Sequence, residues 1–237
     1  MKYILSFGGG VNSVALYFTL KKHDMPIDEI IFADTGTELP ETYEVVEKFK
    51  KIAVIDRVVF STVKSDLSDN LYSYYWDKKC VPSRMRRDCT AKFKIRAMRK
   101  YLRNKYGKEE TFTQYIGIAL EEFHRMKNSD VKYCTLVYPL VDKKIDREEC
   151  KRINQENGFA ETTKSGCYVC PFTRKQGWID LLKNHPGLFD KTIALQHNCP
   201  NPKLRMNLEK FKQVNDPAQL KIEEFEHTCD VAGNCFL

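Results

Sequence analysis

Apolar residues follow two different spacings along the first part of the chain. Residues 2–7 form a short apolar run typical of a buried strand, whereas residues 11–22 carry apolar side chains at helical spacing. The alternation continues with a β-rich run over 27–32, a helical pattern over 40–52 and an extended segment over 54–63. Strand, helix, strand, helix, strand predicts an α/β domain built on a parallel sheet.

The remaining segments divide the chain into two parts. The elements expected next are an irregular aromatic segment over 66–82, a basic helix over 90–106, extended segments over 114–119 and 133–141, and a helix over 147–157. From residue 161 the pattern changes to short helical segments around 177–184 and 202–214. We therefore predict an α/β domain over residues 1–160 and a small, mostly helical C-terminal subdomain over residues 161–237, packed on it.

Three consecutive glycines, Gly8, Gly9 and Gly10, stand between the first strand and the first helix. Glycine lets the backbone approach a ligand closely, and the N–H groups at a helix N-terminus attract an anion. Ser6 and Ser13 add hydroxyl donors on either side. The segment predicts a nucleotide phosphate-binding loop, and a tight strand-to-helix turn without a ligand is the alternative. It matches neither the dinucleotide pattern G-x-G-x-x-G nor the Walker pattern.

Positive charge is unevenly distributed along the chain. The formal net charge is +7, and lysines and arginines are dense between residues 78 and 103. The members of this basic stretch include Arg84, Arg86, Arg87, Lys92, Lys94, Arg96, Arg99, Lys100 and Arg103. One interpretation is a surface for the phosphates of a nucleotide or a nucleic acid, and the other is a solvated helix face. Charge alone does not separate the two.

Nine cysteines are many for a chain with the features of a cytoplasmic protein. No apolar run approaches the roughly 18 residues that span a bilayer, and the glycines after residue 7 come too soon for the apolar region of a signal peptide. We therefore expect a cytoplasmic protein with no membrane partner. Disulfides are rare in that compartment, so clustered cysteines indicate metal binding or redox chemistry.

Four of the cysteines form two pairs. Cys167 and Cys170 make a C-x-x-C in a glycine-led turn, a spacing at which two thiolates share one metal ion or cluster. Cys80 and Cys89 flank part of the basic stretch and make a natural second pair. Together the four thiols predict a metal site that ties the C-terminal part to the α/β domain, with unliganded thiols as the alternative.

The other cysteines carry weaker signals. Cys134 and Cys150 lie in strand-like and helix-like patterns, so we expect them to be buried as small apolar residues. Cys229 and Cys235 lie in the short C-terminal tail, where a thiol could carry sulfur, attack a substrate or resolve a disulfide. A tail without such a role is the alternative.

The glycine loop resembles the PP-loop of the ATP-pyrophosphatase superfamily, Ser-Gly-Gly-Lys-Asp-Ser. That pattern falls on residues 8–13, with Val11 where lysine is usual and Asn12 where aspartate is usual. Losing the lysine removes a cation, so another basic residue would have to neutralise the phosphates. These departures leave nucleotide binding better supported than ATP hydrolysis.

Two later motifs resemble the phosphoadenosine phosphosulfate (PAPS) reductase family of that superfamily. Asp34-Thr35-Gly36, followed by Pro40-Glu41-Thr42-Tyr43, is similar to its Asp-Thr-Gly…Pro-Glu-Thr-Tyr segment. Residues 117–125 resemble its Gly-x-Arg-x-(Asp/Glu)-Glu…Arg motif, with Ala119 in place of the first arginine. The resemblance implies a Rossmann-like adenine nucleotide α-hydrolase fold, in which the nucleotide lies across the carboxyl ends of the strands.

The resemblance also implies which residues form the site. Those expected to bind ATP or another adenine nucleotide with Mg²⁺ are Ser6, Phe7, Gly8, Gly9, Gly10, Asn12, Ser13, Asp34, Thr35, Gly36, Arg87, Lys94, Gly117 and Glu121. Those expected to act in catalysis are Asp34, Arg125, Cys229 and Cys235. For Asp34, capping of the following turn is the alternative role.

The cysteine pattern resembles that of one branch of the superfamily. Some members hold a four-cysteine [4Fe-4S] cluster, and the segments around Cys89 and around Cys167 and Cys170 look like those of the PP-loop protein of DNA phosphorothioation. The resemblance implies a [4Fe-4S] cluster on Cys80, Cys89, Cys167 and Cys170, with structural zinc as the alternative. The reductases' C-terminal Glu-Cys-Gly-Leu-His motif is missing from the tail.

These features lead to one expected function and two alternatives. The first is ATP-dependent adenylation coupled to sulfur transfer onto a nucleic acid or a metabolite, with a cysteine desulfurase or another sulfur donor as partner. The second is a thiol-dependent reductase of adenylyl sulfate or its 3′-phosphorylated form. The third is a nucleotide-binding module with structural zinc and reduced catalysis. A homodimer is left open.

Overall fold

A computed structural model describes residues 1–85, 87–160, 162 and 165–215. The chain divides into two compact units, one formed by residues 1–69 with 89–167 and the other by residues 70–88 with the chain from 168 onward. The second boundary lies close to the division expected at residue 160. Residues 70–88 differ from the expectation, because they belong with the C-terminal part although they interrupt the α/β domain in sequence.

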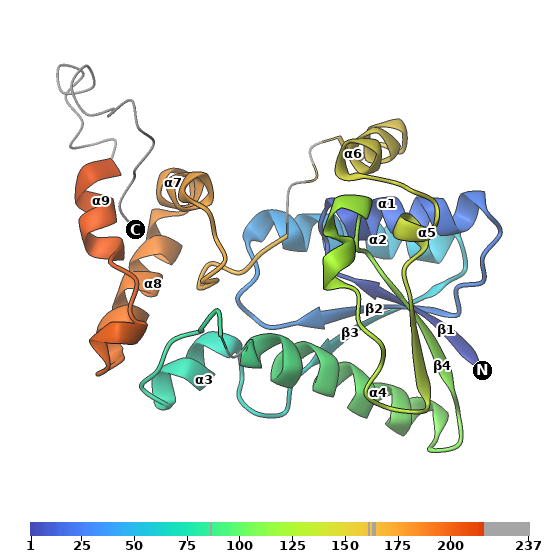
Figure 1. The fold of residues 1–237 in the computed structure, drawn as a ribbon, viewed down its shortest axis with the longest axis horizontal. Coiled ribbons are helices and arrows are strands. Elements are labelled where there is room, and N and C mark those ends of the chain that lie inside the picture. The colour runs from blue at the N-terminus through green and yellow to red at the C-terminus, as the bar shows by residue number, and fades with distance from the viewer. Residues whose placement is uncertain (86, 161, 163–164, 216–237) are drawn as a thin grey trace. The chain divides into compact units, whose positions relative to one another are not determined.

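Five parallel strands form the sheet of the first unit, in the order β3-β2-β1-β4-β5 (Figure 1). The strands are β1 (Lys2–Phe7), β2 (Glu29–Asp34), β3 (Val59–Lys64), β4 (Phe112–Ile116) and β5 (Cys134–Val137). The predicted α/β fold with a parallel sheet is confirmed. The chain runs outward from β1 to β3 and then returns to the other side of β1 as β4. Ligands of open α/β sheets bind at such a reversal, which here lies between β1 and β4.

Helices cover both faces of this sheet. On one face lie α1 (Val11–Lys22), α2 (Pro40–Ile55), α5 (Pro139–Asp142) and α6 (Arg147–Glu156), and on the other lies α4 (Arg96–Tyr106) (Figure 1). Alternate residues of β1 point to opposite faces, so Leu5 and Phe7 pack under α1 and α2 while Ile4 packs under α4. A π-helix, η1 (Cys89–Ile95), leads into α4, and a 3₁₀-helix, η2 (Leu120–Arg125), follows β4.

A fully buried carboxylate joins β2 to α4 at the edge of the sheet where β2 begins. Glu29 accepts hydrogen bonds from the side chains of Ser61, Tyr101 (2.7 Å), Lys105 (2.9 Å) and Tyr106 (2.6 Å). Burial acts to raise the pKa of Glu29, but these hydrogen bonds outweigh it and hold that pKa below its ordinary value. The carboxylate is therefore charged and fully hydrogen-bonded within the fold.

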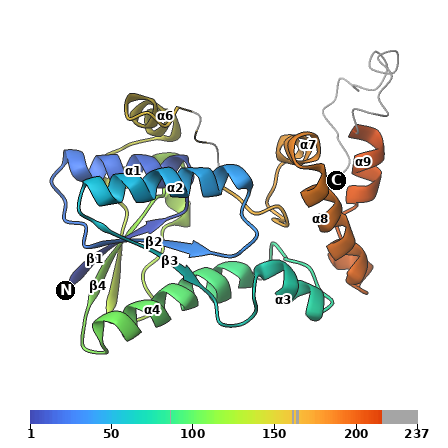
Figure 2. The ribbon, with the colours of Figure 1, turned by 180° about the vertical axis from the view of Figure 1, so that it is seen from behind.

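Helices build the described part of the second unit (Figure 2). They are α3 (Leu71–Asp77), α7 (Lys175–Asn184), α8 (Pro186–Asn198), η3 (Pro202–Leu204) and α9 (Leu208–Asn215). The ring of Phe189 packs against Trp178 and Phe211, which gives this unit an aromatic core of its own. The mostly helical character predicted for the C-terminal part is confirmed for its described residues, which end at 215. Among the described residues, none of the helices is long and apolar enough to cross a bilayer.

Several element boundaries differ from the sequence expectation. The segment expected to be irregular holds α3, whose first turn is capped by the Asn70 side chain accepting from the Ser73 N–H (2.8 Å). Val54 and Ile55 end α2 rather than begin a strand, and both are exposed. The single basic helix expected over 90–106 is divided into η1 and α4. Helix α8 has no counterpart among the expected elements.

Candidate nucleotide site at the glycine loop

The glycine loop connects β1 to α1 at the carboxyl edge of the sheet. Gly9 has φ +68°, and a Cβ there would lie 2.8 Å from the Thr42 Cγ2 atom, so only glycine fits. Phe7 packs its ring against Phe49, with centroids 4.4 Å apart, so its side chain belongs to the core and only its backbone borders the loop. At Phe7 and Gly9 the chain therefore presents only its backbone to the loop.

The Ser13 hydroxyl is committed to the loop itself. It donates to the Gly10 carbonyl oxygen (2.9 Å) and accepts from the Gly10 N–H (3.1 Å). The hydroxyl that the sequence marked as a ligand donor thus holds the loop in shape. Val11 and Asn12 are the first two residues of α1, and the N–H groups in the first turn of a helix have no intrahelical acceptor. They are the natural anion donors of this loop.

The two departures from the PP-loop pattern have different structural consequences. The Val11 side chain is buried in the core beneath α1, so that position offers no cation to a ligand. The Asn12 Nδ2 atom donates to Glu122 Oε2 (2.9 Å), and the other oxygen of Glu122 pairs with Arg125. Among the described residues, the buried Asn12 Oδ1 atom has no hydrogen-bond partner. Arg125, Glu122 and Asn12 are thus connected in this order by an ion pair and a hydrogen bond, and Asn12 is the member that lies in the loop.

The end of β4 approaches the same loop. A Cβ at Gly117 would lie 3.2 Å from the Asn12 carbonyl atoms and the Ser13 nitrogen, so the absence of a side chain permits the close approach. Glu121, expected at the nucleotide, instead accepts from the Arg147 N–H (3.2 Å) at the start of α6. Its neighbour Glu122 faces the loop, although the sequence had not marked it as a site residue.

Asp34 lies at the carboxyl end of β2 and caps the turn that follows. Its Oδ1 atom accepts from the Gly36 N–H (2.8 Å) and from the Tyr43 hydroxyl (2.8 Å), and its Oδ2 atom lies 3.5 Å from Lys64 Nζ. Burial and the Asp34 carboxylate both raise the pKa of Tyr43, which keeps the phenol protonated. Asp34 therefore has the capping role offered as the alternative, and its Oδ2 atom faces the ammonium group of Lys64.

A second polar group follows the same turn. The buried carboxylate of Glu38 accepts from Lys94 Nζ (2.9 Å) and from the Thr35 hydroxyl (3.1 Å). Burial acts to lower the pKa of Lys94, but the charge and hydrogen bond of Glu38 outweigh it and raise that pKa. Interaction with Cys167 and Cys89 acts in the same direction on the pKa of Lys94.

The four cysteines of the expected metal site are shared between the units. Cys89 and Cys167 belong to the first unit, and Cys80 and Cys170 to the second. Within the described ranges, no group of three or more histidine, cysteine or acidic side chains is gathered to hold a metal ion. Cys229 and Cys235 lie outside the described residues.

Two further cysteines are buried as expected. Cys134 and Cys150 are both buried, and burial raises the pKa of both thiols, that of Cys150 to about 12. These thiols are protonated at neutral pH and unsuited to nucleophilic attack.

Part of the basic stretch pairs with neighbouring carboxylates, and part makes other local contacts. On α4, Arg96 and Lys100 pair with Asp66 at 3.8 and 2.8 Å, and Arg99 pairs with Asp130. In the second unit, Arg84 donates to the Pro171 carbonyl oxygen (2.6 Å), and the Arg87 guanidinium lies over the Phe172 ring. These contacts favour the interpretation of α4 as a solvated helix face. They give Arg87 a local packing role.

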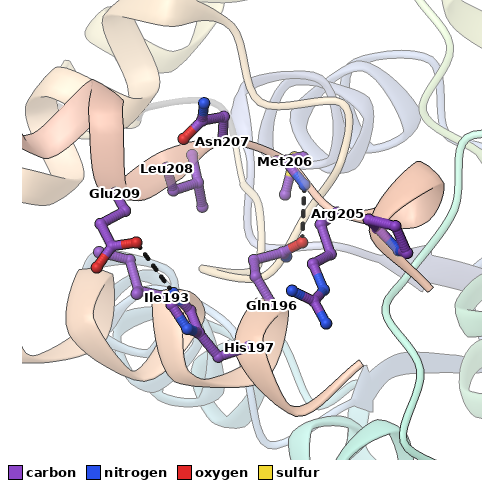
Figure 3. Close-up of a pocket in the computed structure, with 9 residues that line it drawn as sticks. Ile193, Gln196, His197, Arg205, Met206, Asn207, Leu208 and Glu209 are labelled. Carbon is purple, nitrogen blue, oxygen red and sulfur yellow. Dashed lines mark hydrogen bonds and ion pairs between the residues drawn. The ribbon is translucent and has the colours of Figure 1, made fainter. Parts of the chain in front are cut away.

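A pocket of about 280 Å³ lies within the second unit, between α8 and the start of α9 (Figure 3). The Oε1 atom of the buried Gln196 accepts from the Met206 N–H (2.9 Å), and His197 lies 3.3 Å from Glu209. None of the residues singled out in the sequence lines this pocket. The glycine loop therefore remains the candidate site.

Comparison with known proteins identifies the family of the chain. Residues 2–137 match the model of the phosphoadenosine phosphosulfate reductase domain, which is more than half of the chain. The chain belongs to this family. The PAPS reductase domain match extends from β1 to β5 and thus includes the glycine loop, Asp34 and Gly117, whereas Cys167 and Cys170 lie beyond it.

Two individual proteins are similar to this member of the PAPS reductase family. An uncharacterized protein of Methanocaldococcus jannaschii is 26% identical over 201 residues, which are 79% of this chain and 46% of that protein. The chain thus spans about half the length of the curated relative it matches. The phosphoadenylyl-sulfate reductase of Candida auris, in a phosphate complex, aligns with 67% of this chain and 73% of its own at 12% identity, with a TM-score of 0.43.

Proposed function

We propose that the chain binds an adenine nucleotide with its phosphates on the glycine loop and uses it for sulfur transfer. The activity proposed first is ATP-dependent adenylation of an acceptor, a nucleic acid or a metabolite, followed by replacement of the activated group with sulfur. Membership of the PAPS reductase family, whose enzymes belong to nucleotide-linked sulfur metabolism, supports the general class.

The observation that carries the proposal is the backbone shape of the loop. It combines a glycine at positive φ, a helix that begins at Val11, and a strand reversal between β1 and β4. A helix N-terminus at a reversal of strand order is a preferred site for phosphate groups. Because Gly117 has no side chain, the backbone after β4 packs directly against the backbone of Asn12 and Ser13 at the start of α1.

The proposed chemistry has two steps. An oxygen of the acceptor attacks the α-phosphorus of ATP, the bond to the bridging oxygen breaks, and pyrophosphate leaves. Sulfide, or the terminal sulfur of a persulfide supplied by a cysteine desulfurase, then attacks the acceptor carbon, and AMP leaves with the oxygen. With a persulfide donor, a thiol reductant then cleaves the resulting disulfide and releases the thiolated acceptor. Backbone N–H groups of the loop would stabilise the charge that develops on pyrophosphate, and Mg²⁺ bound with ATP would share that task.

The thiol set is suited to an iron–sulfur cluster. Four thiolates form the usual ligand set for [4Fe-4S] and also for structural zinc. Cys167 is bridged to Glu38, and Glu38 binds Lys94, which lies in the same π-helix as Cys89. Adjoining segments thus supply these two thiols, which supports their sharing one centre. We propose that these two and Cys80 and Cys170 hold the cluster. Such a centre would supply a site for sulfur or electrons.

A second candidate function follows from the family match. A thiol-dependent reductase would bind adenylyl sulfate or its 3′-phosphorylated form, and a thiol would attack the sulfate sulfur with release of AMP or its phosphorylated form. The family model is that of a sulfonucleotide reductase, which favours this alternative. Val11 favours it as well, because the loop lacks the cation usual beside a leaving pyrophosphate.

Product analysis separates the candidates. The full chain, purified without oxygen, is incubated with ATP, sulfide and candidate acceptors, and in parallel with adenylyl sulfate, its 3′-phosphorylated form and a thiol reductant. AMP with pyrophosphate supports adenylation, whereas sulfite supports reduction. Tight nucleotide binding without either product would indicate a binding module. Failure of every adenine nucleotide to bind would overturn the whole proposal.

A further inference from the structure

A short segment from the far end of the first unit lies directly against the glycine loop. We call residues 165–167 the strap. A Cβ built at Gly10 would lie 2.6 Å from the Ser165 hydroxyl oxygen and 2.8 Å from the Ser165 nitrogen. A Cβ at Gly8 would lie 3.6 Å from the same hydroxyl oxygen. Ser165 therefore occupies the space that side chains at these two glycines would fill.

The strap is held in this place by the turn after β2. The Leu39 N–H donates to the Gly166 carbonyl oxygen (3.0 Å), and Glu38 and Cys167 form an antiparallel bridge. Glu38 is itself buried and bound to Lys94. The strap that contacts the glycine loop is therefore fixed by backbone contacts to the turn after β2, and that turn is bound to Lys94 through Glu38.

The polar groups of Ser165 match what a phosphate at the loop requires. Its hydroxyl and its N–H are both hydrogen-bond donors, and both face Gly10. Among the described residues, the hydroxyl has no hydrogen-bond partner. Val11 supplies no cation and the Ser13 hydroxyl is committed to Gly10, so the loop is short of side-chain donors. A neutral donor from the strap would supply one.

We propose that Ser165 is a positioning residue for the nucleotide, and that its hydroxyl donates to a phosphate oxygen bound on the glycine loop. The strap would then connect phosphate binding to Cys167, two residues further along the chain. The proposal rests on the proposed function, because it assumes that the loop binds a nucleotide. It further explains why Gly10 must lack a side chain, since any side chain there would displace the strap.

Equilibrium binding to a graded set of ligands tests the proposal. Affinities for adenosine, AMP, ATP and adenylyl sulfate are measured by calorimetry on the full chain and on Ser165→Ala. A hydrogen bond to a charged group corresponds to about tenfold to a hundredfold in affinity. We expect Ser165→Ala to weaken binding of at least one phosphate-bearing ligand by this factor and to leave adenosine binding unchanged.

Two further variants sharpen the test. Ser129→Ala is the matched control, because its hydroxyl bonds to the Val131 backbone and to Cys134, neither of which belongs to the glycine loop or the strap. This variant should leave every affinity unchanged. Gly10→Ala should weaken the same ligands, and adding Ser165→Ala to it should have little further effect, because both changes remove one contact.

The outcomes separate this proposal from the proposed function. If the unaltered chain binds none of the nucleotides, the proposed function itself fails. If it binds them and Ser165→Ala binds all of them equally well, the role of Ser165 is refuted. An equal loss for adenosine and for the phosphate-bearing ligands would assign Ser165 a structural role and also refute it.

Discussion

Replacing Asn12 by aspartate would restore the residue usual in PP-loops and, in this chain, would set two carboxylates against each other. The Asn12 Nδ2 atom now donates to Glu122 Oε2 over 2.9 Å. In Asn12→Asp that donor becomes a second negatively charged oxygen. We expect the variant to be less stable than the unaltered protein at neutral pH.

The size of the effect follows from the geometry. Two unit charges about 4 Å apart repel by roughly 1 kcal/mol in water and roughly 4 kcal/mol at an effective dielectric constant of about 20. The Glu122 side chain is 24% exposed and pairs with Arg125, so we place the repulsion at about 1–2 kcal/mol. The lost hydrogen bond adds about 1 kcal/mol. The free energy of unfolding should therefore fall by about 2–3 kcal/mol.

The pH dependence gives the sharper test. The neighbouring charge raises the pKa of the introduced carboxyl in the folded state above its value in the unfolded chain. The repulsion is therefore absent below the unfolded pKa, roughly 4, and grows as pH rises through the folded pKa. Urea unfolding between pH 4 and pH 8 should show a deficit, relative to the unaltered protein, that widens toward neutral pH.

Two control variants separate charge from hydrogen bonding. Asn12→Ala removes the hydrogen bond without adding charge, so its deficit should be smaller and independent of pH. Combining Asn12→Asp with Glu122→Gln exchanges the two partners and should recover most of the stability. A deficit in Asn12→Asp that is absent, or constant over the pH range, would refute the assignment of this contact.

Three further predictions concern the sheet, the loop support and the thiols. Glu29→Gln should lower the free energy of unfolding by about 2–4 kcal/mol above pH 5, because Lys105 loses its charged partner. The deficit, measured by chemical unfolding, should shrink only as pH falls below the unfolded pKa toward the lowered folded pKa. Gly117→Ala should weaken nucleotide binding roughly tenfold by pushing against the start of α1, with unchanged affinity contradicting the close approach. Anaerobically purified Cys89→Ser should lose absorption near about 400 nm and its bound iron, whereas Cys134→Ala should keep both; zinc in place of iron would overturn the cluster.

Much of the fold could be predicted because its signals are local. The apolar run of β1, the helical spacing after Val11 and the glycines between them specify three connected elements within 22 residues. Helix α3 was missed because its tyrosines and tryptophan are indifferent helix formers, although Asn70 was a readable N-cap. Helix α8 also had a readable start in Pro186 at its first turn.

The parts of the site that escaped prediction depend on contacts between distant residues. Glu121 and Glu122 are adjacent and chemically alike, and only the path of η2 decides that the second faces Asn12. Ser165 lies more than 150 positions from Gly10, and nothing in its local sequence indicates their contact. The commitment of the Ser13 hydroxyl to Gly10 is likewise a matter of loop geometry rather than of residue type.

The measurement that tests the central claim most directly is a calorimetric titration of the full chain at fixed salt with adenosine, ATP and adenylyl sulfate. A glycine loop that binds phosphates predicts one site per chain and tighter binding of a phosphate-bearing ligand than of adenosine. In Gly9→Val, where the backbone shape is lost, that preference should disappear. Absence of binding, or equal affinity for adenosine and for the phosphate-bearing ligands, would contradict the account.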